Sequence, residues 1–187
     1  MHRYLLHNLT TSHDEIELFH YVDNIFQSKK QLNIDDISDH INSDSETFYF
    51  IPSSKIASVA LDASQKDNDE ATRARLLSEM DDFIVSDISE NEIFIHRNSK
   101  LNLAILVDKS YLASITKKLR VTGSKIYIYP EHMLSFLKNE SSIFQIADRF
   151  IFSFSSGEGF SQNATHLEDY LKLVKKERED FSPKVFL

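Results

Sequence analysis

The pattern of apolar and polar side chains predicts three short strands at the start of the chain. His2–Asn8 is a short apolar run, Glu15–Tyr21 alternates between two faces, and Ile25–Lys30 follows it after a turn at Val22–Asn24. A turn-rich segment, residues 9–12, separates the first two. Consecutive strands joined by such short turns pair antiparallel. The opening of the sequence therefore predicts an antiparallel meander.

The periodicity changes after Asn33, from that of a strand to that of a helix. Ile34, Ile37 and Ile41 recur at helical spacing, and Asn33 is a favourable N-cap residue. Thr47–Ile51 is a β-branched and aromatic run that predicts a central strand buried on both faces, and a proline ends it. A strand reached through a helix tends to lie parallel in the same sheet. The order β-β-β-α-β indicates the opening half-domain of a ribonuclease-H-like or actin-like fold.

The middle third predicts a second group of elements in the order α-β-β-α-β. Asp67–Glu92 holds nine acidic residues and two arginines, and its apolar residues recur at helical spacing, which predicts an amphipathic helix with a charged outer face. Two strands, a helix capped by Asp108, a further strand and a short helix opened by Pro130 follow. The expected ranges are Glu92–Arg97, Leu101–Val107, Asp108 to Gly123, Lys125–Tyr129 and Pro130–Leu137.

The last third predicts two strands, a loop and a helix. The strands are Ile143–Ala147 and Phe150–Ser155, Ser156–Gly159 forms the loop, and Thr165 is the expected cap of the helix. Lys184–Leu187 is a last apolar segment that resembles a strand. The sequence contains no repeat of fixed period.

These elements predict a mixed α/β fold in three parts. Residues 1–66 form a first ribonuclease-H-like or actin-like subdomain, residues 67–140 an inserted α-β-β-α-β subdomain, and residues 141–187 the beginning of a second actin-like subdomain. A chain of 187 residues is long enough for such lobes to bury a core of their own.

Composition and charge narrow the classes of function. The net charge is −8, which argues against duplex DNA or an anionic bilayer as the main partner, and the absence of cysteine excludes disulfides and thiolate metal sites. No signal peptide and no apolar run of about 18 residues is present. We therefore expect a soluble, cytoplasmic chain.

The residues that catalysis would need are missing from the sequence. The first strand carries no carboxylate for a nuclease-type metal pair, and three glycines cannot build the phosphate-binding loops of an actin-type enzyme. Gly157-Glu158-Gly159 favours a hairpin loop, because Glu158 would repel a phosphate. The serines beside this loop lack the surroundings of a nucleophile elbow. We expect no catalytic residue and no cofactor.

One cluster has the residue types of a metal site. Asp36 and His40 are spaced i, i+4 on the first helix, with Asp35 and Asp39 beside them, a set that could bind a divalent ion. Acidic residues are also common in the first turn of a helix on an exposed polar face. We favour the second interpretation and expect no metal.

The order of the segments resembles a known family. The segments FYFIPSSKIASVALDAS, ARLLSEMDDFIVSD, EIFIHR, LNLAILVDKSYLASITKKL, KIYIYPEHMLSFL and IFQIADRFIFSFSSGEG follow one another as in the cytoplasmic domain of the type II secretion system protein L. Glu131 stands where that family usually has Asp, and the Pro-Tyr that commonly opens the acidic helix is missing. The resemblance implies an actin-like fold without working ATPase machinery.

The resemblance also implies partners and a location. It suggests a non-catalytic component of the inner-membrane platform that docks the amino-terminal domain of the secretion ATPase (the E component), contacts the M and F components and a second copy of itself, and lies at the cytoplasmic face of the bacterial inner membrane. A transmembrane helix outside these residues would provide the membrane attachment. The expected partner-binding residues lie in the acidic segment: Glu79, Asp81, Asp82, Asp87, Glu90 and Glu92.

Two alternatives from other functional classes stay open. The first is an actin-like nucleotide phosphotransferase whose loops have diverged, and the second is a small acidic inhibitor or immunity protein that masks a basic active site. A response to Mg-ATP would favour the first, and the genomic neighbours would reveal the second.

Overall fold

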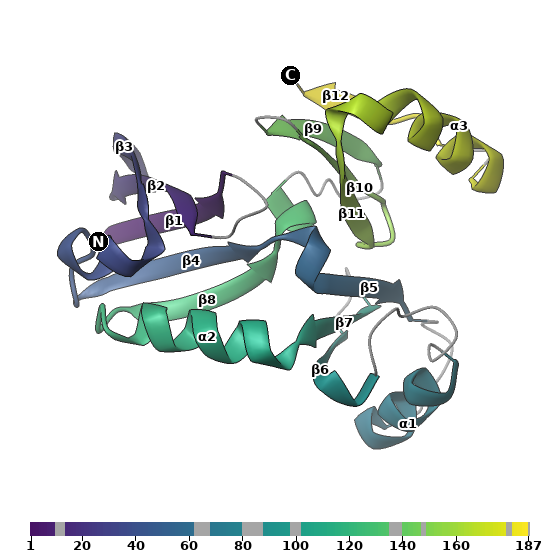
Figure 1. Cartoon of the computed structure of the whole chain (residues 1–187), viewed down its shortest axis with the longest axis horizontal. Coiled ribbons are helices and arrows are strands. Elements are labelled where there is room, and N and C mark those ends of the chain that lie inside the picture. Colours follow the sequence, from purple (N-terminus) through teal and green to yellow (C-terminus); the bar gives the residue numbers. More distant parts are fainter. Residues whose placement is uncertain are drawn as a thin grey trace.

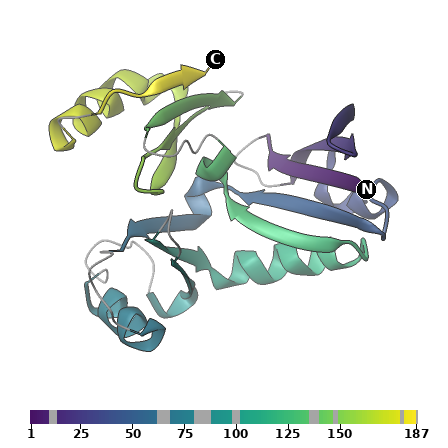
Figure 2. The ribbon, with the colours of Figure 1, turned by 180° about the vertical axis from the view of Figure 1, so that it is seen from behind.

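A computed structural model describes residues 1–9, 14–61, 68–79, 88–97, 102–134, 140–146, 149–178 and 181–186. Within these ranges the chain forms sheets of five, four and three strands. Figures 1 and 2 show the five-stranded sheet with helix α2 on one side of the molecule and the other two sheets, with α1 and α3, on the opposite side. The mixed α/β fold expected from the sequence is confirmed.

The first sheet contains the predicted meander. Its strand order is β3-β2-β1-β4-β8, in which β1 to β3 pair antiparallel while β1, β4 and β8 run parallel. Asp23 and Asn24 connect β2 to β3 with φ of 49° and 66°, as expected for the tight turn that matches strand twist. The strands are β1 (His2–Asn8), β2 (Glu15–Val22), β3 (Ile25–Asn33), β4 (Ser45–Ile51) and β8 (Lys125–Pro130).

One face of this sheet packs on α2 (Lys109–Arg120) and on the short 3₁₀ helix η1 (Ile34–Asp39). Asp108 caps α2 as predicted, because its carboxylate accepts from the Tyr111 N–H at 2.9 Å. The side chains of this core are Tyr4, Leu6, Ile16, Leu18, Ile34, Ile37, Ile41, Tyr49, Ile51, Val107, Ile115 and Leu119.

Two expectations for this lobe are wrong in detail. Burial alternates along β4, so the strand is not buried on both faces; Phe48 and Phe50 are half-buried and lie against Tyr127 and Tyr129 of the neighbouring strand instead of under a further layer. The helix after Asn33 is a 3₁₀ helix, although the Asn33 side chain caps it as predicted.

The second sheet is small and leads into α2 without a loop. Its order is β5-β7-β6, all antiparallel, and β7 (Asn102–Asp108) ends at the residue that caps α2. The sequence predicts α-β-β-α-β elements for residues 67–140. The last two of them belong with the first sheet, because β8 pairs with β4 and α2 packs on one face of that sheet. The other elements are η2 (Ser53–Lys55), β5 (Ile56–Ala60), α1 (Asp69–Glu79), η3 (Ile88–Glu90) and β6 (Asn91–Arg97).

The third sheet repeats the topology of the first. Its order β11-β10-β9-β12 corresponds to β3-β2-β1-β4, with two antiparallel pairs followed by a parallel one. No repeat in the sequence predicts this similarity, because the first and third sheets share their strand order and not their residues. The elements are η4 (Glu131–Leu134), β9 (Ser142–Ile146), β10 (Arg149–Ser153), β11 (Gly159–Asn163), η5 (Ala164–His166), α3 (Leu167–Glu177) and β12 (Lys184–Phe186).

Two predictions for this half need correction. β11 was not expected, because Gly159–Asn163 carries a single large apolar residue and lacks the alternation of a strand. Thr165 is not the cap of the last helix: the Asn163 side chain accepts from the Thr165 N–H at 3.0 Å and caps η5, which leads into α3. The apolar side chains of α3 pack against β10 and β11 around Phe152 and Phe154.

Gly159 fixes the approach of the third sheet to the other lobes. Its N–H donates to the Ser58 hydroxyl at 3.0 Å, and that hydroxyl donates to the Gly159 carbonyl at 3.2 Å. A Cβ atom at this position would lie 2.5 Å from Cβ of His132 and close to the carbonyl oxygen of Phe152. Only glycine therefore fits between β10, η4 and β5.

We predict that Gly159→Ala lowers the free energy of unfolding by about 1–3 kcal/mol, because the added methyl group overpacks a backbone contact that cannot yield. Urea denaturation monitored by circular dichroism measures the change. Ser161→Ala on the same strand is the matched control and is expected to stay within about 0.5 kcal/mol of the parent. Equal stability of the two variants would contradict the close packing described for Gly159.

Candidate functional site

The carboxyl ends of the three parallel strands meet at one edge of the first sheet. Asn8 ends β1, Ser53 follows β4 by two residues, and Glu131 directly follows β8. In open α/β sheets this edge is where ligands bind. The chemistry of these residues therefore decides whether the fold retains an active centre.

Glu131 is the buried charge at this edge. Its side chain is fully buried and lies 2.8 Å from Nε2 of His7, and it accepts from the Ser53 N–H at 3.2 Å. Burial alone would raise its pKa, but the hydrogen bond with His7 and the charge of Arg149 outweigh this, so the pKa of Glu131 lies below its usual value. The carboxylate is ionised at neutral pH.

Arg149 reaches this edge from the second half of the chain. Its Nε donates to Glu131 at 3.1 Å, and its Nη2 donates to Glu131 and to the Asn8 carbonyl, the latter at 2.7 Å. Nη1 donates to the Leu9 carbonyl at 3.3 Å. The guanidinium is buried, and its hydrogen bonds with the carboxylate and both carbonyls occupy the centre of this edge.

Two tyrosines continue the polar network into the first lobe. The Tyr49 hydroxyl donates to the Asn8 side chain at 2.7 Å and is hydrogen-bonded to the Tyr111 hydroxyl. Burial raises the pKa of both phenols, that of Tyr111 to about 12. Both phenols therefore stay neutral and serve as hydrogen-bonding groups of the interior.

A second set of polar contacts joins the third sheet to its neighbours. Burial lowers the pKa of His132 to about 4, so the ring is neutral, and its Nε2 donates to the Gly157 carbonyl at 3.0 Å. Glu158 accepts from the Ala60 N–H at 3.0 Å and from Arg178 at 2.9 Å. Burial would raise the pKa of Glu158, but these hydrogen bonds lower it. The Gly157–Gly159 loop is thus part of an inter-lobe junction.

The sequence did not predict the residues of the buried centre. Arg149 lies between the two strands expected at Ile143–Ala147 and Phe150–Ser155, yet it begins β10, whose five residues are all buried. A signal was present, because an arginine next to the apolar segment FIFS and a glutamate after the strand IYIYP are charges placed in apolar surroundings. That the two charges meet depends on the packing of distant elements.

Only part of the predicted partner-binding set lies in the described structure. Asp81, Asp82 and Asp87 lie outside the described residues, and Glu79 ends α1 with a side chain that is not described. Glu90 is exposed on η3. Glu92 is half-buried on β6 and lines a shallow hollow with the basic residues Lys109, Lys117 and Arg120 of α2.

The acidic cluster on η1 is dispersed. In a 3₁₀ helix with three residues per turn, Asp36 and His40 do not share a face as they would in an α-helix. Asp35 instead pairs with Lys118 at 2.8 Å. In the part of the chain that the structure describes, no group of three or more His, Asp or Glu side chains is placed to hold a metal ion.

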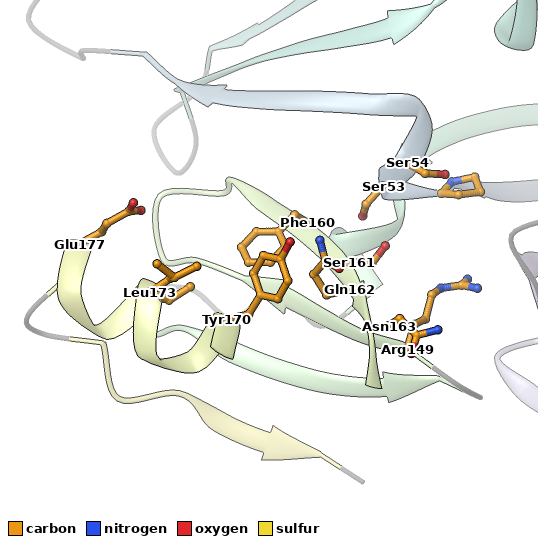
Figure 3. A pocket seen from close by; sticks show the side chains of 12 residues that line it. Ser53, Ser54, Arg149, Phe160, Ser161, Gln162, Asn163, Tyr170, Leu173 and Glu177 are labelled. Atoms are coloured by element: carbon orange, nitrogen blue, oxygen red, sulfur yellow. The ribbon is translucent and has the colours of Figure 1, made fainter. Parts of the chain in front are cut away.

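A cavity of about 720 Å³ lies beside this centre, between η2, β11 and α3. Figure 3 shows Ser53 and Ser54 of η2 across from β11, with Phe160 and Tyr170 adjacent to each other. Phe160, Ser161, Gln162 and Asn163 follow one another along its wall. Of the described residues in the lining, Arg149 is the one cation, and Glu131 already neutralises it.

A second hollow, of about 540 Å³, is mainly apolar. It lies between β6, β7, α2 and β8, with Phe94 and Tyr129 among its more exposed residues.

Within the described residues, no helix is long and apolar enough to cross a membrane.

Comparison with known proteins establishes the fold. No family model matches the sequence, and no curated protein matches it. The structure is similar to the cytoplasmic domain of EpsL, an inner-membrane component of the type II secretion system of Vibrio cholerae, with a TM-score of 0.77 and 14% identity over 99% of this chain and 82% of that one. The actin-like fold expected from the resemblance is confirmed.

Two further structures share the fold more distantly. A Bacteroides thetaiotaomicron protein with an actin-like ATPase fold and unknown function has a TM-score of 0.56 and 14% identity over 98% of this chain and 80% of that one. A chain of the PilM–PilN type IV pilus biogenesis complex has a TM-score of 0.51 and 7% identity over 95% of this chain and 65% of that one.

We predict that Glu131→Gln lowers the free energy of unfolding at pH 7 by about 3–5 kcal/mol, because it leaves the buried Arg149 charge without its counter-ion. Glu46→Gln, which removes the partly exposed pair with Arg3, is the control and should cost about 1 kcal/mol or less. Urea denaturation of both variants gives the comparison.

The pH dependence should differ between the parent and the Glu131→Gln variant. Because the pKa of Glu131 is lowered on folding, its stabilising contribution is present above the unfolded pKa of about 4.3 and is lost as the pH falls through the lower folded pKa. The difference in unfolding free energy should therefore shrink on acidification below about pH 4. A difference that stays constant through the acidic range would contradict an ionised Glu131.

Proposed function

We propose that this chain is a non-catalytic component of the inner-membrane platform of a type II secretion or related pilus-assembly machine, and that it docks the machine's ATPase at the cytoplasmic face of the membrane. The fold shared with the EpsL cytoplasmic domain and with the PilM–PilN complex supports this proposal. The amino-terminal domain of the ATPase is the proposed first partner. The M and F components and a second copy of the chain are further ones.

The observation that carries the proposal is the position of Arg149. Its guanidinium is buried against Glu131 and two backbone carbonyls at the carboxyl ends of the parallel strands. An actin-like phosphotransferase needs this space for phosphate and a divalent ion, together with glycine-rich loops that this sequence lacks. A scaffold whose centre is closed in this way retains its outer surfaces for binding another protein.

The acidic segment is the proposed docking surface for the ATPase. Asp67–Glu92 holds nine acidic residues against two arginines, a net charge of −7 in a chain whose net charge is −8. Of its members, Glu90 is exposed and Glu92 is half-buried. Such a surface attracts a basic partner and speeds association more than it adds affinity. Charge steering of this kind weakens as salt increases.

The nucleotide phosphotransferase is tested by thermal stability. If Mg-ATP bound at a concentration about one hundred times its dissociation constant, it would stabilise the folded chain by about 2.7 kcal/mol. We expect no change in Tm with saturating Mg-ATP or Mg-ADP. A nucleotide-dependent rise of several degrees would overturn the non-catalytic function.

We predict that Glu90→Gln with Glu92→Gln slows association with the purified amino-terminal domain of the secretion ATPase of the same bacterium several-fold at low salt. Surface plasmon resonance at two salt concentrations measures the rate, and the difference from the parent should shrink at high salt.

The matched control is Glu168→Gln with Asp169→Asn, which removes two exposed charges from α3 and should leave the rate near that of the parent. If the domain does not bind the chain at all, the docking function is wrong. If it binds with a rate independent of salt, the acidic segment is not the interface.

A further inference from the structure

We infer that the outer edge of β11 is a docking site for an extended segment of a partner protein, which would pair with it as an additional strand. The inference rests on the proposed docking function, since it names one surface through which that function is exercised. It is independent of the acidic segment. Its evidence is the unpaired backbone of β11 and the cavity that exposes it.

The direction of the backbone groups follows from the hairpin that joins β10 to β11. The Phe154 N–H donates to the Glu158 carbonyl at 2.9 Å, so these two residues form a hydrogen-bonded pair. Pairs alternate along an antiparallel ladder. Phe160 and Gln162 therefore bond to β10, whereas the N–H and C=O groups of Gly159, Ser161 and Asn163 point away from it.

The first outward position already has a hydrogen-bond partner within the chain. The N–H and C=O groups of Gly159 are both satisfied by the hydroxyl of Ser58, which takes the place of a neighbouring strand. Among the described residues, no such partner faces the N–H of Ser161, its carbonyl or the N–H of Asn163. β11 is the outermost strand of its sheet, so these groups lie at an open edge.

The cavity beside β11 is open to an extended chain. Four consecutive residues of β11 line it, which places the strand's edge and not one of its faces against the cavity. Ser53 lies on the opposite wall; its side chain is 9% exposed, and its hydroxyl oxygen is buried without a hydrogen-bond partner within the described structure. The outward backbone groups of Ser161 and Asn163 on the β11 wall suit a ligand rich in donors and acceptors.

The side chains around the cavity describe the partner segment further. Tyr170, Leu173 and Val174 of α3 form an apolar wall, while Ser53 and Ser54 form a polar one. Successive side chains of a strand point to opposite sides, so a segment with alternating apolar and polar residues would satisfy both walls. A polyphosphate does not fit this lining, because Arg149 is already bound to Glu131.

The experiment uses a phage-displayed library of random octapeptides selected on the complete chain, followed by synthesis of the enriched peptide. We expect enrichment of sequences with alternating apolar and polar residues. On binding, the amide signals of Ser161 and Asn163 in the ¹H–¹⁵N spectrum should shift and become protected from exchange, whereas those of Phe160 and Gln162 are protected already.

Ser161→Pro removes an outward N–H without breaking the pairing with β10 and should weaken peptide binding about ten-fold. Ser161→Ala keeps that N–H and should bind within about two-fold of the parent. Should Ser161→Pro fail to fold, N-methylation of alternate peptide amides provides the same test, because it removes backbone donors while leaving the side chains in place.

Three outcomes would overturn the inference: no peptide is enriched over the unselected library, the peptide shifts signals elsewhere on the protein, or Ser161→Pro and N-methylation leave affinity unchanged. These experiments distinguish a failure of the β11 site from a failure of the proposed docking function. If the ATPase domain binds both Ser161 variants equally and no peptide is enriched, the docking function stands without this site. If the peptide binds β11 and no platform protein does, the site stands without that function.

Discussion

The buried ion pair between Arg149 and Glu131 is the interaction on which the rest of the structure depends. It joins a strand of the second half to the edge at which the three parallel strands of the first half end. A buried charge without a counter-ion is costly, so neither residue can move away alone. The guanidinium also donates hydrogen bonds to the backbone carbonyls of Asn8 and Leu9. The ion pair therefore fixes both the direction of the chain after β1 and the position of β10.

The molecule divides its apolar and polar interactions between lobes and junctions. Each sheet has its own hydrophobic cluster, around Tyr49 in the five-stranded sheet, Leu106 in the three-stranded one and Phe152 in the four-stranded one. Val107, Ile56 and Ile105 of the three-stranded sheet also pack against the core of the five-stranded one. The four-stranded sheet contacts its neighbours through hydrogen bonds and ion pairs, such as those of Glu158, Ser58 and Arg149. Hydrogen bonds require a defined distance and direction, whereas apolar contacts tolerate sliding. The four-stranded sheet is therefore held in a specific orientation by polar groups, and this orientation shapes the cavity beside β11.

Local signals in the sequence predicted local structure well. The apolar and polar pattern with its turns predicted β1 to β3, and the side chains of Asn33 and Asp108 cap the segments after them as expected. The misses arise where tertiary packing overrides local preference. β11 carries a single large apolar residue, Phe160, which packs against the core of the third sheet. Phe48 of β4 lies against Tyr127 of a strand that follows much later in the chain. The pairing of Arg149 with Glu131 and the duplicated strand order depend on chain topology, which no short window of sequence contains.

The continuity of β7 and α2 has a mechanical consequence. Asp108 is both the last residue of the strand and the cap of the helix, so no flexible connection separates the three-stranded sheet from the helix that supports the five-stranded one. A force applied to the three-stranded sheet would be transmitted through β7 and α2 to the five-stranded sheet. A protein pulling on one lobe would thus tilt the other lobe with it.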